Sequence, residues 1–383
     1  MRLVLLYHRP LDDPFQGTSL SCKAFLDQLR ESFQVEVVAP RFRGREQHMK
    51  EGGESIVSST ATTVLRSLAL ILFSFLSNRL KADTPRPQII VGFGAVVAGP
   101  SALWAALTCS RFVYYPQDYT PRVAESWSHT GRGDVKLLKW LIWPIEKIAL
   151  KRANMILVYS EAMRNDFLTA GVSRSKLRIY SIPHRIPMAD PVNVEGWRRE
   201  LALEQKVGVA FVGSLEYPPN LRSFEFIRCR LAPKLMELVP NVVLVICGLG
   251  SDRYGGRCPA NMRLLGPVKD LDGVLFACKI GIAPMDTPGG KSNKVIDYAL
   301  HGLSVVATPQ ATRGMPESPS VKVADIQDFV DSVCLEVARL SQETIPRDHA
   351  PDPAYVTYVR QFSAAELGSW FKQLFAIEGK IGS

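Results

Sequence analysis

Short apolar segments alternate with stretches of helical periodicity along the whole chain, a pattern typical of parallel α/β proteins. Each apolar segment is four to eight residues long and ends in a turn residue or a helix-start signal. In the first half we expect strands at 2–7, 35–40, 88–93, 111–116, 155–160 and 177–182. Ser160 is expected to cap the following helix at its N-terminus, and Gly171 to end it.

The alternation stops in a proline-rich run at 182–193 and then begins again. Helices are expected between the later strands, and the best defined covers 292–301 and stops at Gly302. In the second half the expected strands are 207–213, 241–248, 262–266, 279–285 and 303–308.

Two such arrays joined by one linker predict an α/β protein with two facing Rossmann-like domains. The expected division is 1–186, 187–354 and 355–383. The last part contains an amphipathic stretch at 355–375, which we expect to be one helix that returns to the first domain. A chain of 383 residues fits two domains of ordinary size.

The net charge of +9 is confined to the first half of the chain. Residues 1–190 carry 25 Lys and Arg against 16 Asp and Glu, whereas the remainder is balanced. No basic stretch is interleaved with aromatic residues, so a nucleic-acid partner is not expected. The first domain is therefore expected to face a phosphate-bearing acceptor or an anionic membrane surface.

Residues 64–81 form an apolar segment with basic flanks that is too short to cross a bilayer. Either a buried helix or a helix lying in the membrane interface fits this segment. Seven scattered cysteines without a Cys-x-x-Cys pair indicate free thiols in a reducing compartment. We expect a cytoplasmic protein that could sit peripherally on the inner face of the membrane.

The strongest chemical signal is the glycine-rich turn that follows the expected strand 279–285. Gly289 and Gly290 allow close approach of a ligand, and the following helix offers unpaired N–H groups to an anion. Lys291 and Lys294 lie three residues apart in its first turn, where the helix dipole disfavours cations unless an anion binds. The turn therefore predicts a diphosphate site, against the alternative of a solvated basic turn.

Asp297 lies one turn after Lys294, on the same face of that helix. A carboxylate there could accept hydrogen bonds from ribose hydroxyls. An ion pair with Lys294 at a spacing of three residues is the alternative.

The segment 283–314 resembles the donor-binding signature of retaining GT-B glycosyltransferases, especially those of family 4. The segments 211–226 and 262–285 also resemble that family, and so do 145–163 and 179–186 in the first half. The resemblance implies the GT-B fold and a nucleotide-sugar donor. No metal or other cofactor is expected. It further implies that Lys294 is catalytic, and that the donor is bound by Gly213, Ser214, Val268, Gly289, Gly290, Lys291 and Asp297.

Three positions depart from the family pattern. The first acid of its usual pair is replaced by Gly289, and the Arg that usually follows Gly213 is replaced by Ser214. The usual Pro-Asn-Gly at the end of the first domain is replaced by 183–185, Pro-His-Arg. These changes weaken the prediction for sugar identity and catalytic competence more than the prediction for the fold.

The first domain is expected to bind the acceptor. Gly17 would approach the donor phosphates at a helix start, and Asp118 is the candidate polar contact to the acceptor. A loop-capping role is the alternative for Asp118, and His8 and His184 are interpreted as structural. No His, Asp or Glu cluster has metal-ligand spacing.

The expected activity is transfer of a sugar to a saccharide or lipid-linked hydroxyl, with retention, in synthesis of a surface polysaccharide or glycoconjugate. A nucleotide-sugar epimerase on the same fold is the alternative enzyme. A catalytically degenerate regulatory subunit that binds nucleotide sugar is the non-enzymatic alternative. The segment 89–99 resembles a dinucleotide fingerprint, but its third glycine position is Val97, so we interpret it as a tight turn.

Overall fold

The computed structural model describes most of the chain, and the polypeptide separates into two compact units. Unit 1 comprises residues 1–183 and 362–383, and unit 2 comprises residues 184–361. The residues that the structure describes are 2–9, 11, 17–39, 86–127, 138–182, 184–286, 292–342 and 349–376.

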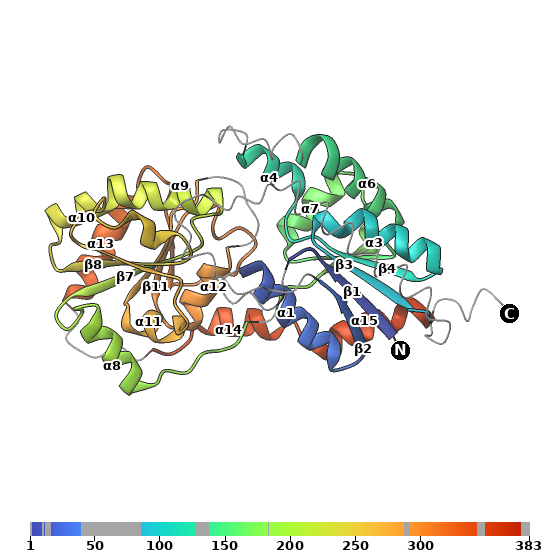
Figure 1. The fold of residues 1–383 in the computed structure, drawn as a ribbon. Helices are drawn as coiled ribbons and strands as arrows, with labels where there is room; N and C mark the ends of the chain where they lie inside the picture. Colours follow the sequence, from blue (N-terminus) through green and yellow to red (C-terminus); the bar gives the residue numbers. More distant parts are fainter. Residues whose placement is uncertain are drawn as a thin grey trace, which may run out of the picture. The chain divides into compact units, whose positions relative to one another are not determined.

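Unit 1 is built on a six-stranded, fully parallel sheet with the order β2-β1-β3-β4-β5-β6 (Figure 1). Its strands are β1 Arg2–Tyr7, β2 Gln34–Val38, β3 Ile89–Phe93, β4 Arg111–Tyr115, β5 Met155–Val158 and β6 Leu177–Ile179. Its helices are α1 Gly17–Arg30, α3 Ala95–Thr108, α4 Thr120–Trp127, the π-helical turn η3 Leu138–Ile142, α6 Trp143–Arg152, α7 Glu161–Thr169, the short η4 Arg174–Lys176 and α15 Ala364–Ala376.

Helices cover both faces of this sheet, and its four inner strands β1, β3, β4 and β5 are therefore almost wholly buried and apolar. On one face, α3, α6 and α7 pack on the strands around Phe112 and Ile156. On the other face Phe25 of α1 contacts Phe93 and Tyr115, and Phe371 of α15 contacts Phe33. The C-terminal helix α15 therefore completes the core of unit 1.

Unit 2 contains a second six-stranded parallel sheet, with the order β12-β11-β10-β7-β8-β9. Its strands are β7 Val207–Val212, β8 Val242–Cys247, β9 Met262–Gly266, β10 Ile280–Ala283, β11 Ser304–Ala307 and β12 Val321–Val323. Its helices are α8 Pro191–Glu200, α9 Pro218–Phe226, η5 Ile227–Leu231, α10 Ala232–Leu238, η6 Ser251–Tyr254, α11 Leu271–Ala277, α12 Asn293–Leu300, α13 Phe329–Ser341 and α14 Pro353–Arg360.

The strand order of unit 2 is that of a Rossmann fold, since the chain builds outward from β7 in one direction and then from β10 in the other. The helices α11, α12 and α14 cover one face, whereas α9, α10 and α13 cover the other. The order reverses between β7 and β10, and ligands bind such sheets at the carboxyl ends of these two strands.

The helix α12 is fixed against the sheet by Tyr298. Its ring lies over Gly281 of β10, where an added Cβ would come within 2.3 Å of the ring. Its buried hydroxyl accepts a hydrogen bond of 2.8 Å from the backbone N–H of Val212, the last residue of β7. Tyr298 thereby connects α12 to both strands at the reversal point.

The predicted fold class is confirmed, and each predicted strand corresponds to an observed one. Ser160 caps α7 by accepting from the N–H of Met163. The expectation of one helix at 355–375 is wrong, because the chain leaves the helical conformation after Arg360 and forms α14 and α15. These two helices belong to different units.

The apolar segment 64–81 lies outside the described residues. Within the part of the chain that is described, no helix combines the length and the apolar character needed to cross a bilayer. All seven cysteines are free thiols.

We predict that Tyr298→Phe destabilises unit 2 by about 1–3 kcal/mol, because the N–H of Val212 then loses its acceptor in a half-buried position. Tyr355→Phe is the matched control, since among the described residues the hydroxyl of this buried tyrosine has one hydrogen-bond partner, the sulfur of Met315 at 3.9 Å. Urea unfolding of both variants measures the difference. Equal losses would mean that the hydrogen bond to Val212 contributes nothing.

Candidate functional site

Lys294 occupies the first turn of α12, at the carboxyl edge of the unit 2 sheet. Its Nζ donates to Oδ1 of Asn220 in α9 at 2.8 Å, and lies 4.2 Å from the ring centroid of Phe211 in β7. The side chain is half-buried. Three elements around the strand reversal therefore place this ammonium group.

The ammonium group of Lys294 forms no ion pair with any described carboxylate. Burial lowers the pKa of Lys294 to about 7. Desolvation disfavours the charged form, and a neighbouring anion would restore it. The position thus favours binding of an anionic ligand, which would offset the cost of holding the cation.

Ser292, directly before α12, adds a second feature. Its side chain is 6% exposed, and its hydroxyl has no hydrogen-bond partner among the described residues. The hydroxyl does not cap the helix, so the first N–H groups of α12 receive no side-chain acceptor from it. The predicted Gly289, Gly290 and Lys291 precede Ser292 and lie outside the described residues.

Asn220 joins Lys294 to the loop after β7. Its Nδ2 donates to the carbonyl oxygen of Ser214 at 3.1 Å while its Oδ1 accepts from Lys294. An added Cβ on Gly213 would come within 2.7 Å of the Asn220 side chain, so this contact requires glycine. The structure thus brings Gly213, Ser214 and Lys294 together through Asn220. Sequence reasoning did not single out Asn220, although it lies in the segment 211–226 that carries the family resemblance.

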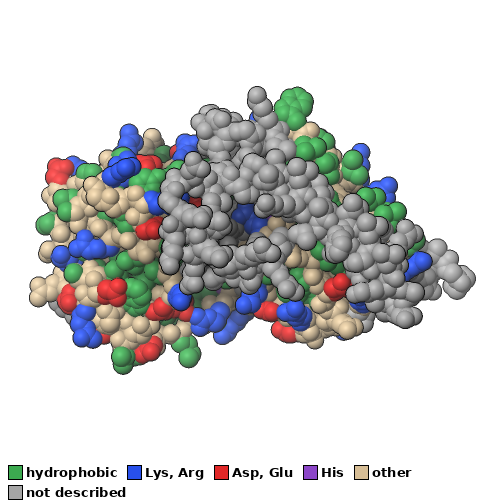
Figure 2. All heavy atoms as spheres, viewed as in Figure 1, with side chains coloured by type: hydrophobic (Ala, Val, Ile, Leu, Met, Phe, Trp, Pro, Cys, Tyr) green, Lys and Arg blue, Asp and Glu red, His purple; other side chains and the backbone are tan. Residues whose placement is uncertain are grey.

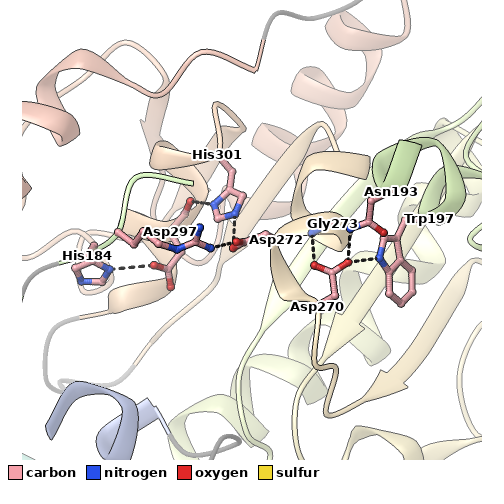
Figure 3. A network of polar contacts seen from close by, with 9 residues as sticks. His184, Asn193, Trp197, Asp270, Asp272, Gly273, Asp297 and His301 are labelled. Carbon is pink, nitrogen blue, oxygen red and sulfur yellow. Dashed lines mark hydrogen bonds and ion pairs between the residues drawn. The ribbon is translucent and has the colours of Figure 1, made fainter. Parts of the chain in front are cut away.

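Asp297 does not pair with Lys294 but with His184. Its Oδ1 lies 3.0 Å from Nδ1 of His184, and the aspartate side chain is 37% exposed (Figure 3). The second carboxylate oxygen has no other described partner. The ribose role of Asp297 remains a prediction. Sequence reasoning interpreted His184 as a structural or linker residue and did not predict this contact. The departure from the family pattern at 183–185 was the available signal.

A second group of contacts lies beside this pair in Figure 3. Nδ1 of His301 lies 2.6 Å from the Asp297 carbonyl oxygen and its Nε2 lies 3.1 Å from Oδ1 of Asp272. Both ring nitrogens therefore lie within hydrogen-bond distance of an oxygen atom. Arg185 forms an ion pair with the same Asp272. Hydrogen bonds from His301 lower the pKa of Asp272, with the charges of His301 and Arg185 adding to the effect.

Val268 follows β9 and packs half-buried against the core of unit 2. Asp270, two residues later, caps α11 by accepting from the N–H of Gly273 at 3.1 Å, and Nε1 of Trp197 donates to it at 2.7 Å. Burial opposes ionisation of Asp270, but these hydrogen bonds and one from Asn193 hold its pKa below the usual value. Asp270 therefore anchors the loop that carries the predicted donor-binding residue Val268.

In unit 1, Asp118 lies just after β4, beside Glu146 of α6. Burial raises the pKa of Asp118 to about 7. The pKa of Glu146 is also raised to about 7, by burial and by the charge of Asp118, against hydrogen bonds from Thr120 and Tyr114. The Tyr114 hydroxyl donates to Oε1 of Glu146 at 2.5 Å, whereas Oε2 is buried with no described partner. Two interacting carboxyl groups thus titrate near neutral pH at this strand end.

Two glycines shape the same edge of unit 1. Gly17 is the first residue of α1, as expected, and its role toward the donor remains a prediction. Gly94 has φ of 95° in the turn between β3 and α3, which agrees with the interpretation of 89–99 as a tight turn.

Burial and the neighbouring Arg9 lower the pKa of His8 to about 3, so this histidine is neutral.

Two family models match the sequence. Residues 15–181 match Glycosyltransferase Family 4, and residues 206–336 match Glycosyl transferases group 1. No curated protein matches the chain.

Solved structures match over nearly the full length of the chain, at low sequence identity. HepE of Anabaena, in complex with UDP-glucose, superposes with a TM-score of 0.65 and 14% identity, covering 98% of this chain and 99% of HepE. Sucrose-phosphate synthase from Thermosynechococcus elongatus superposes with a TM-score of 0.69 and 14% identity, covering 98% of this chain and 100% of the synthase. WaaG, a glycosyltransferase involved in lipopolysaccharide biosynthesis, superposes with a TM-score of 0.58 and 14% identity, covering 96% of this chain and 95% of WaaG.

The two family matches follow one another along the chain, one within each unit, and the sheet topology agrees with the solved structures. The chain belongs to the GT-B glycosyltransferases, with a Glycosyltransferase Family 4 domain followed by a Glycosyl transferases group 1 domain.

Proposed function

We propose that the protein transfers a sugar from a nucleoside-diphosphate sugar, bound by unit 2, to a hydroxyl of a saccharide or lipid-linked acceptor. The observation that carries this proposal is Lys294, a half-buried cation at the strand reversal without a described carboxylate partner. A diphosphate supplies the missing anion, and the N-terminus of α12 adds N–H donors. Because HepE was solved with UDP-glucose, a UDP-sugar is the first donor to test.

In the proposed reaction, Lys294 and the N–H groups of α12 stabilise the charge that develops on the leaving diphosphate. Asp297 accepts from the ribose with the oxygen that His184 leaves open. Asp118 in unit 1 accepts a hydrogen bond from the acceptor hydroxyl. Retention is inferred from the family resemblance, and we assign no protein nucleophile.

The acceptor fits surface polysaccharide or glycoconjugate synthesis, since WaaG acts in lipopolysaccharide biosynthesis. The free cysteines fit work in the cytoplasm. Incubation with a panel of nucleotide sugars, with and without membrane extract, tests the proposal through nucleotide release. Acceptor-dependent release supports a transferase, acceptor-independent release an epimerase, and donor binding without release a regulatory subunit.

We predict that Lys294→Met weakens UDP-glucose binding about 10- to 100-fold, the value of a charge-assisted hydrogen bond to phosphate. The variant should be at least as stable as the native protein. Burial lowers the pKa of Lys294 below that of the unfolded chain, so its charge costs stability at neutral pH and below. Calorimetry measures both quantities.

Lys279→Met is the matched control for that variant. Lys279 is half-buried at the start of β10, the opposite end of the strand, where its Nζ donates to the Leu340 carbonyl at 3.2 Å. UDP-glucose affinity should stay unchanged in this control. If Lys294→Met also retained full affinity, the donor site would lie elsewhere.

We predict that UDP-glucose affinity falls as the pH rises above about 7, because the pKa of free Lys294 is about 7 and only its protonated form attracts the diphosphate. Binding at about pH 8 should therefore take up a proton, which calorimetry in buffers of different ionisation enthalpy detects. Lys294→Arg remains protonated throughout and should abolish this pH dependence. An unchanged dependence in the arginine variant would assign it to another group.

We predict that Asp118→Asn lowers acceptor-dependent nucleotide release by at least about tenfold without changing UDP-glucose affinity. The ionised form accepts the hydrogen bond more strongly and can take up the proton of the acceptor hydroxyl, so native activity should rise with pH through about 7. Glu146→Gln removes the neighbouring charge and should shift this rise to lower pH. Asp27→Asn on the exposed face of α1 is the control. A rise in activity through about pH 7 that is unchanged in Asp118→Asn would contradict the assignment.

A further inference from the structure

Asp297 lies three residues after Lys294 on α12, a spacing at which the two side chains can form an ion pair within the helix. The structure shows a different arrangement. Oδ1 of Asp297 lies 3.0 Å from Nδ1 of His184 (Figure 3), while Lys294 donates to Asn220. The predicted ribose residue and the predicted phosphate residue therefore have separate partners, although a single turn of helix carries both.

The position of His184 is fixed by its neighbour in the chain. The His184 side chain is 12% exposed, and the adjacent Arg185 forms an ion pair with Asp272 of α11. Asp272 also lies 3.1 Å from Nε2 of His301, the residue that ends α12. Two consecutive residues thus attach the chain to α11 and to α12, which limits the positions that the His184 imidazole can adopt.

The contact with His184 also determines how the Asp297 carboxylate is presented. An ionised carboxylate only accepts hydrogen bonds, so Nδ1 of His184 is the donor to Oδ1. Oδ2 has no partner among the described residues, and the Asp297 side chain is 37% exposed. A carboxylate held through one oxygen presents the other in a defined direction. It therefore loses less conformational freedom when a ligand hydroxyl binds.

The charge distribution of unit 2 does not supply this orientation. On the described surface of unit 2 that Figure 2 shows, Lys and Arg side chains are interspersed with Asp and Glu side chains. The fields of such mixed charges largely cancel at a distance, and salt screens them beyond roughly 10 Å. The direction of the Asp297 carboxylate therefore depends on its local contact with His184.

We propose that His184 is a positioning residue of the donor site, which holds the Asp297 carboxylate for the ribose and makes the site select a nucleoside diphosphate with ribose hydroxyls. The inference rests on the proposed function, because it takes the ligand of unit 2 to be a nucleoside diphosphate. A ligand without these hydroxyls leaves Oδ2 of Asp297 desolvated and unpaired, which weakens binding. His184 acts on the ribose only through Asp297.

The chemistry of the contact identifies a replacement that preserves it. Nδ1 of histidine and Nδ2 of asparagine are both bonded to Cγ, so asparagine presents an N–H to Asp297 from the same place in the side chain. Asparagine is also the usual residue of the family pattern where this chain has His184. Alanine removes the donor altogether. His184→Asn and His184→Ala therefore form a matched pair.

Calorimetry of the full chain with UDP and with 2′,3′-dideoxy-UDP, which lacks both ribose hydroxyls, tests the proposal. The native protein should bind UDP about 10- to 100-fold more tightly than the dideoxy analogue, the range of a hydrogen bond to a charged group. His184→Ala should reduce this ratio at least about threefold, because the carboxylate then has to be ordered on binding. His184→Asn should keep the native ratio.

The dideoxy analogue is the internal control, because its affinity should be the same in the native protein, His184→Ala and His184→Asn. Asp297→Ala should bring the ratio close to one. His349→Ala replaces another half-buried histidine of unit 2, whose ring packs on Phe276 with centroids 5.5 Å apart, and should keep the native ratio.

Three results would overturn the inference. A native ratio that persists in His184→Ala would mean that His184 does not position the carboxylate, while the binding of UDP would leave the proposed function standing. Equal losses in His184→Asn and His184→Ala would mean that the N–H donor has no effect. A native protein that binds neither nucleotide would contradict the proposed function itself, and the inference with it.

Discussion

The organisation of unit 2 depends on holding the Lys294 ammonium group at the strand reversal without a carboxylate. A carboxylate neighbour would neutralise the lysine and exclude a phosphate, whereas full burial alone would cost too much. The structure adopts an intermediate solution. The neutral oxygen of Asn220 and the π-face of Phe211 partly solvate the cation and leave it available to an anion.

This arrangement requires α12 to pack close to the sheet, and the residues at its contacts are small enough to allow it. Gly281 admits the Tyr298 ring, and Gly213 admits Asn220. The Tyr298 hydroxyl accepts the hydrogen bond of the last N–H of β7. Small residues on the strands and large residues on the helices thus set the position of the charge.

Most of the fold could be predicted from the sequence because strands buried on both faces are continuous apolar runs. The last strand, β12, was missed because it has only three residues, Val-Lys-Val, and two of them are exposed. The break between α14 and α15 was missed because the amphipathic pattern continues through residues 361–363. Lys294 could be predicted from local spacing, whereas Asn220 and His184 reach the site from 74 and 113 residues away. Such contacts depend on packing between elements, about which spacing within one element carries no information.

The helix α6 supports the predicted acceptor site of unit 1 from its inner side. Its inner side carries Glu146, whose charge interacts with Asp118 at the carboxyl end of β4. Its outer side carries Ile145 and Ile148, and an amphipathic helix of ten residues is rigid enough to hold both sides in register. The packing of this inner side against β4 thus holds the two carboxyl groups close to one another.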